Sequence, residues 1–174
     1  MSAFFTNWTL FFTFLFCMWN LITTRYNIKN LNWLAIHHIL FTWSFVSNLV
    51  VVLIYWPFLH KLYLSLPHIK NDPIMIILGY TLHSTPLAFQ LFIFWFNKID
   101  IVMRKRDMVF AIIMTVAYLT LNFCLTKARG TPTYPFLTWK DPIESIIVVV
   151  GLTLFGVCVF YVAMLFTIWA RKTG

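Results

Sequence analysis

A single histidine, His83, lies near the middle of an uncharged, largely apolar run from Pro73 to Asn97. A helix over this run spans about 37 Å at ~1.5 Å per residue, and a bilayer core requires only about 20 residues. An imidazole at that depth is costly unless it finds a partner, so His83 is a functional candidate. The alternative is a neutral histidine that bonds to a neighbouring Ser, Thr or Asn and locks helix packing. The run by itself is compatible with both roles.

Hydroxyl groups are the other residues that could take part in chemistry at membrane depth. A hydroxyl nucleophile needs an adjacent base, and His83 is the only deep candidate base. The five acidic residues all lie in loops or at span ends, which excludes a buried carboxylate pair and with it glycosidase chemistry and proton-pump relays. The residues alone do not choose among the hydroxyls of Thr6, Thr9, Thr13, Thr42, Ser44 and Thr81.

The remaining histidines and the cysteines predict no metal site and no cofactor. His37 and His38 are adjacent, so on a helix they point about 100° apart and cannot chelate one ion together. Both are expected at the membrane interface. His60 and His68 are expected in a solvated loop. The three cysteines lie inside apolar runs with no Cys or His at metal spacing, and they are expected to act as small buried hydrophobes.

Composition indicates which elements position these groups. The chain has 174 residues, of which 61% are hydrophobic, 20% aromatic and only 10% charged, and its mean hydropathy is +0.82. A soluble domain of this size could not cover its surface with polar groups, so we expect an integral membrane protein. The net charge of +8 does not indicate nucleic-acid binding. The basic residues fall between apolar runs, where Lys and Arg set topology and contact membrane lipids.

Stretches without charge delimit five membrane spans. Their apolar residues are continuous and do not alternate, which excludes a β-barrel and predicts an all-α bundle of about five transmembrane helices. The linkers are too short to hold a folded domain. Eight of the 13 basic residues lie on the side of the C-terminus, which the positive-inside rule therefore places in the cytoplasm or an equivalent compartment. The predicted spans are approximately 3–24, 31–59, 73–97, 108–126 and 143–170.

Other polar residues carry structural expectations. Asp107 and Asp141 precede the last two spans and are expected to cap them. The segment from Gly130 to Trp139 contains two prolines and a glycine yet stays apolar, so it is expected to form an ordered loop packed against the rim of the bundle. Interhelical hydrogen bonds worth about 0.6 kcal/mol each are expected from Asn20, Asn48, Gln90, Asn97 and Asn122.

Three segments resemble the androgen-induced membrane proteins, a family of six-span threonine hydrolases that cleave fatty acid esters of hydroxy fatty acids. Segment 82–86, Leu-His-Ser-Thr-Pro, resembles the family's His-Thr/Ser-Thr segment. Ala-Tyr at 117–118, followed by Tyr-Pro-Phe-Leu at 134–137, resembles a family span and loop. Segment 4–8, Phe-Phe-Thr-Asn-Trp, resembles the segment that bears the catalytic threonine. The resemblance implies that Thr6 is the nucleophile and His83 the base, and that the chain begins at the family's second span.

Two functions follow as expectations. In one, the chain is a non-catalytic accessory subunit of a larger membrane complex, derived from the hydrolase family and partnered by lipids and other subunits. In the other, it is an intramembrane threonine hydrolase in which Thr6 attacks an ester carbonyl and His83 moves the proton. The expected compartment is the mitochondrial inner membrane or the endoplasmic reticulum. A channel or transporter is disfavoured, because the sequence has neither inverted repeats nor paired membrane acids.

Overall fold

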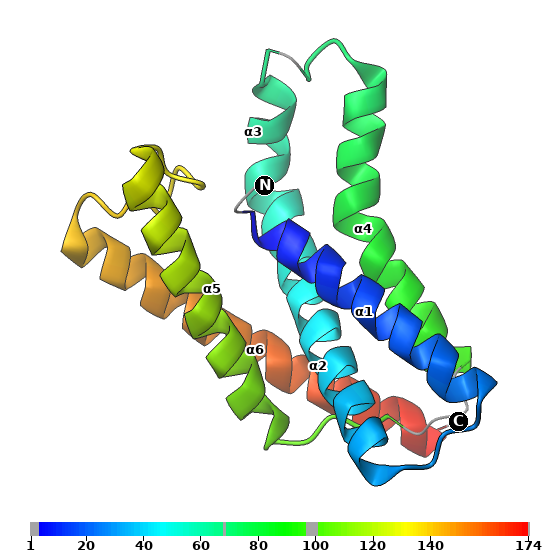
Figure 1. Cartoon of the computed structure of the whole chain (residues 1–174). Coiled ribbons are helices and arrows are strands. Elements are labelled where there is room, and N and C mark those ends of the chain that lie inside the picture. The colour runs from blue at the N-terminus through cyan, green and yellow to red at the C-terminus, as the bar shows by residue number, and fades with distance from the viewer. Residues whose placement is uncertain (1–3, 68, 97–100, 174) are drawn as a thin grey trace. The chain divides into compact units, whose positions relative to one another are not determined.

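The computed structural model describes residues 4–67, 69–96 and 101–173, and these residues form helices and connecting loops without a β-strand (Figure 1). Five stretches are long and apolar enough to cross a membrane, which confirms the all-α, multi-pass fold. The helical elements are α1 (Phe5–Arg25), α2 (Leu31–Ile54), the π-helical turn η1 (Tyr55–Leu59), α3 (His60–Ser65), α4 (Pro73–Phe96), α5 (Asp107–Arg129) and α6 (Pro142–Thr173).

The second span is longer than predicted, because it continues through η1 and α3 to Ser65. Pro57 explains the π turn: a proline inside a helix has no N–H to donate and its ring collides with the carbonyl four residues earlier. The helix absorbs this by widening for one turn, and the His60 N–H bonds to the Tyr55 carbonyl five residues back. His60 is therefore helical, and its predicted place in a loop is wrong.

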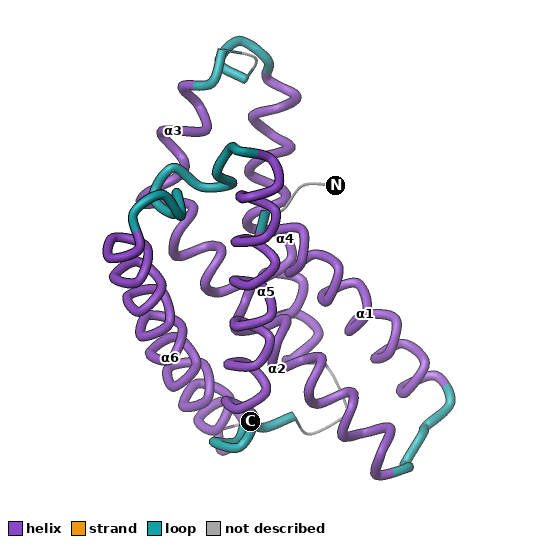
Figure 2. The backbone as a smooth tube through the Cα atoms, turned by 60° about the vertical axis from the view of Figure 1, so that its left-hand side comes forward, coloured by secondary structure: helices purple, strands orange, loops and turns teal. Residues whose placement is uncertain are grey.

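The chain divides into two compact units, and each is described by itself. The α1–α4 unit is Trp8–Ile101, and the α5–α6 unit is Met1–Asn7 with Val102–Gly174. Short loops join consecutive helices within each unit, drawn in teal in Figure 2.

Polar side chains bond across helices at the centre of the α1–α4 unit. The buried Asn48 amide donates to Thr13 Oγ1 at 2.7 Å and to Gln90 Oε1 at 2.9 Å, so it joins α2 to α1 and α4. The Gln90 amide donates in turn to Ser44 Oγ. The interhelical role predicted for Asn48 and Gln90 is confirmed. Asn122 accepts instead from Trp139 of a loop, and Asn97 lies outside the described residues.

His37 is a second buried polar residue of this unit, and its predicted position at the membrane interface stays a prediction. Its side chain is 1% exposed, and its Nε2 lies 3.0 Å from Asn20 Oδ1 on α1. The Phe16 ring packs against the imidazole with 5.3 Å between centroids. Once Asn20 supplies a hydrogen bond, burying the histidine between two helices no longer leaves a polar atom unpaired.

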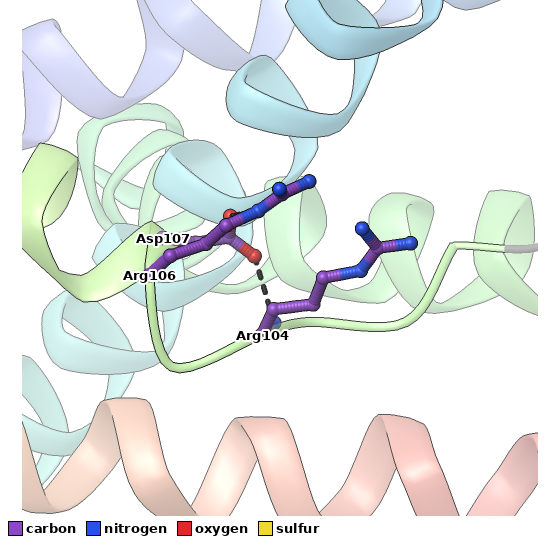
Figure 3. Close-up of polar contacts among 3 residues, drawn as sticks. All are labelled: Arg104, Arg106 and Asp107. Carbon is purple, nitrogen blue, oxygen red and sulfur yellow. Dashed lines mark hydrogen bonds and ion pairs between the residues drawn. The ribbon is translucent and has the colours of Figure 1, made fainter.

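The two aspartates before the last spans behave differently. Asp141 Oδ1 accepts from the Ile143 and Glu144 amides at 2.7 and 3.1 Å, so its predicted capping role is confirmed. Asp107 is instead the first helical residue of α5, and its Oδ2 accepts from the Arg104 amide at 2.7 Å (Figure 3). It therefore closes the turn that leads into α5, and its predicted role as the preceding cap is wrong.

Candidate functional site

His83 lies on α4, half-buried, with its Nδ1 2.6 Å from the carbonyl oxygen of Gly79 one turn earlier. A carbonyl can only accept, so Nδ1 carries the proton and Nε2 carries the lone pair. A backbone carbonyl that fixes the tautomer in this way leaves the other ring nitrogen free to act as a base. The geometry therefore leaves Nε2 as the basic nitrogen of His83.

Tyr55 fixes the plane of that imidazole. The two rings are stacked with 3.7 Å between centroids and an angle of 8°. Tyr55 opens the π turn and is only 2% exposed, so the surrounding protein holds it in place. His83 is thus oriented by a hydrogen bond in the ring plane and by an aromatic face above it.

Gly79 has a second role, because the Tyr63 side chain of α3 packs against it. A Cβ built on Gly79 would lie 2.5 Å from Cε1 of Tyr63, closer than carbon atoms pack. The Tyr63 hydroxyl donates to the Met75 carbonyl at 2.6 Å, which anchors the ring over the glycine. The same residue that orients His83 is therefore the one that lets α3 dock.

His60 packs within the same aromatic group. Its ring lies 4.9 Å from Trp56 and 5.3 Å from Tyr80, measured between centroids. Among the described residues, His60 Nδ1 and Tyr55 Oη are buried without a hydrogen-bond partner. Buried polar atoms are normally paired, so both are groups that water or a bound ligand would satisfy. His68, the other histidine predicted in this loop, lies outside the described residues.

Thr6 lies in the first turn of α1, half-buried, in the α5–α6 unit. The preceding Phe5 amide donates to the Tyr134 hydroxyl oxygen at 2.7 Å, which satisfies one of the free N–H groups at a helix start. The Phe4 ring packs edge-on against Tyr134, and Phe5 packs likewise against Tyr118. Two tyrosines thus hold the turn that carries Thr6.

The loop that carries Tyr134 is ordered and packed, as predicted. Leu137 is 2% exposed, and the Trp139 indole donates to Asn122 Oδ1 of α5 at 2.8 Å. Burial raises the pKa of the Tyr134 phenol, so the group stays protonated and uncharged at neutral pH.

The two predicted catalytic residues fall in different units, since His83 belongs to the α1–α4 unit. A contact between Thr6 and His83 therefore stays a prediction. The structure does constrain other hydroxyls. Thr13, Ser44 and Thr81 each donate to a carbonyl of their own helix, at 2.7, 2.7 and 2.9 Å. These bonds are typical of structural hydroxyls inside helices.

No protein-family model, curated protein or solved structure matches the chain. The resemblance of three segments to the androgen-induced membrane proteins therefore stays a prediction. Any proposal about function rests on that resemblance and on the geometry described above. Within residues 4–67, 69–96 and 101–173, no group of three or more His, Cys, Asp or Glu side chains could hold a metal ion.

Sequence reasoning identified His83 but missed the residues that orient it. Tyr55 is distant from His83 along the chain, and nothing in its type distinguishes it from the other aromatic residues. Pro57 inside an apolar run was the available signal, because it indicates a local break in the α-helical hydrogen bonds beside Tyr55. Gly79, four residues before His83, was a second signal for a close helix contact.

Replacing Tyr134 by phenylalanine is expected to free the first turn of α1. The ring contact with Phe4 remains, but one of the two tyrosine hydroxyls that accept from the Phe5 amide is lost. We expect a cost of about 1 kcal/mol, seen as a roughly fivefold faster hydrogen exchange of that amide. Tyr26→Phe is the matched control, since Tyr26 is 73% exposed. Equal exchange rates in Tyr134→Phe and wild type would contradict the anchoring role.

Proposed function

We propose that this chain is an intramembrane hydrolase of lipid esters that uses Thr6 as nucleophile and His83 as general base. The observation that supports it most is the bond between His83 Nδ1 and the Gly79 carbonyl, because it leaves Nε2 as the basic atom. The stack on Tyr55 adds the fixed orientation that proton transfer requires. The substrate class, fatty acid esters of hydroxy fatty acids, rests on the segment resemblance.

The proposed reaction has two stages. Thr6 Oγ attacks the ester carbonyl while His83 Nε2 takes the hydroxyl proton, and the histidine then returns the proton to the departing alcohol. Water next attacks the acyl-threonine with His83 again acting as base, which releases the fatty acid and restores Thr6. The proposal requires Thr6 Oγ and His83 Nε2 to come within about 2.6–3.2 Å in the substrate complex.

The test is hydrolysis of a fatty acid ester of a hydroxy fatty acid by the purified chain in detergent, with the acyl-enzyme trapped by rapid acid quench and mapped by mass spectrometry. We expect turnover in wild type, an acyl group on the peptide that contains Thr6, and loss of both in Thr6→Ala. Thr24→Ala is the control, because that exposed hydroxyl bonds only to carbonyls of its own helix. Full turnover in Thr6→Ala, or none in wild type, would refute the proposal.

An accessory subunit is the second candidate, and α6 supplies the observation that favours it. A Cβ at the exposed Gly151 would meet no atom within 4 Å, and Ile147 and Leu154 on the same face of the helix are more than 60% exposed. Small residues on an exposed face let a partner helix pack closely. This function predicts co-purification with other subunits at a fixed ratio from the mitochondrial inner membrane. A tagged chain found as a monomer in the endoplasmic reticulum would contradict it and fit the hydrolase.

A further inference from the structure

An open apolar groove runs along the α5–α6 unit beside the loop that joins its two helices. Its volume is about 340 Å³, within the range of roughly 300–1,000 Å³ that ligand pockets occupy. Four residues come from α5, one from the loop and one from α6: Val116, Leu119, Thr120, Phe123, Trp139 and Val149.

The two polar side chains that line the groove already donate their hydrogen bonds within the protein. The Thr120 hydroxyl donates to the Val116 carbonyl, and the Trp139 indole N–H is bonded to Asn122. A water molecule in a buried site needs two to four polar partners, and these groups are already engaged. Because α5 is a membrane-spanning helix, hydrocarbon is the surrounding medium, and an acyl chain is the ligand that fills such a groove.

One end of the groove carries a cation. Lys127 donates to the Trp139 carbonyl at 3.0 Å, and its ammonium lies 5.7 Å from the centroid of the Phe123 ring. Lys127 thus touches two of the groove's lining residues. An ammonium has three N–H donors, so two remain for a ligand. Val116, at the other end of the lining, lies eleven residues earlier on α5, which is about 16 Å at ~1.5 Å per residue.

The backbone conformation of Trp139 indicates that the Lys127 end of the groove has a defined structure. Its φ is +56°, in the left-handed region that a bulky residue rarely adopts. In this conformation the Trp139 carbonyl receives Lys127 and the indole reaches Asn122. The backbone strain is therefore offset by hydrogen bonds that hold the Trp139 ring and the Lys127 ammonium at this end of the groove.

We propose that this groove binds one acyl chain of an anionic phospholipid, with the lipid phosphate on Lys127. An open apolar groove with a cation and a tryptophan at one end suits an acyl chain and an anionic headgroup. The site lies wholly within the α5–α6 unit, and it does not depend on the hydrolase proposal.

The test uses phosphatidylglycerol and phosphatidylcholine with a diazirine in one acyl chain, each incorporated with the purified chain into nanodiscs and photolysed. Crosslinks are mapped by peptide mass spectrometry. We expect phosphatidylglycerol to label the peptides containing Val116–Phe123 and Val149 roughly fivefold more than phosphatidylcholine. This is the preference for anionic lipid that one basic residue near a membrane surface typically provides. Lys127→Gln is expected to remove this preference while labelling by both lipids continues.

Val149→Trp fills the groove and is expected to reduce labelling by both lipids at these peptides. Val150→Trp is its matched control, because Val150 is the next residue on α6 and 51% exposed, outside the lining. Lys172→Gln, at the far end of α6, controls for the loss of a positive charge. Equal labelling by the two lipids in wild type, or unchanged labelling in Val149→Trp, would overturn the proposal.

Discussion

Replacing His83 by alanine is expected to lower the rate of ester hydrolysis by about 10²–10⁴-fold, the usual contribution of a positioned general base. The structure gives the reason, since Nε2 is the basic atom of a ring held by Gly79 and Tyr55. The substituted chain is expected to fold, because His83 is only half-buried and its one recorded hydrogen bond is to its own helix. The measurement is initial rate per folded protein, with thermal unfolding recorded in parallel.

His37→Ala is the matched control for His83→Ala. His37 also lies on a helix long and apolar enough to cross a membrane, but it is buried and bonded to Asn20. Its loss leaves the Asn20 carbonyl oxygen without that donor, so we expect lower stability and an unchanged rate per folded molecule. The opposite pattern, with full activity in His83→Ala, would show that His83 is a structural histidine and would remove the base from the proposed reaction.

Replacing Gly79 by alanine is expected to damage both packing and activity. The new Cβ would lie 2.5 Å from the Tyr63 ring, so either the ring or α3 must move. Forcing an extra methyl group into a packed contact typically costs about 1–3 kcal/mol. We also expect a lower hydrolysis rate, because any shift of the Gly79 carbonyl turns the His83 imidazole that it holds. Unfolding free energy and rate per folded protein are the two measurements.

Tyr63→Ala distinguishes this steric explanation from a general intolerance of substitution at Gly79. Removing the Tyr63 ring takes away the atom that the Cβ would meet. Alanine at position 79 should therefore cost much less in the Tyr63→Ala background than in wild type, and a double-mutant cycle measures this coupling. Strict additivity of the two changes would contradict the contact.

The fold was predictable because a membrane-spanning helix can be recognised from one continuous stretch of sequence. Long uncharged runs specify spans without reference to any other part of the chain, and four of the five spans begin and end near the predicted residues. The second span was predicted to end at Leu59 because His60 and Lys61 looked like loop residues. In the structure the His60 ring packs against Trp56, and the helix continues through both residues.

The site was less predictable, because its geometry depends on pairs of residues that are distant along the chain. A histidine deep in a span stands out because burying its polar ring in a membrane costs free energy. Its hydrogen-bond partner, however, depends on its rotamer, and its stacking partner lies on another helix. His37 shows the limit most clearly. Its burial between helices depends on Asn20, a residue seventeen positions away on α1, and the sequence did not indicate that pairing.

The π turn at Tyr55–Leu59 also links the length of this span to its proline. A π turn is equivalent to one extra residue in an α-helix, and one residue corresponds to about 100° of rotation. If Pro57 were replaced and the turn became regular α-helix with all its residues kept, α3 would rotate by about that angle to a different face of the span. Tyr63 would then no longer meet Gly79. Homologous chains that lack the proline should therefore also lack one residue of this turn.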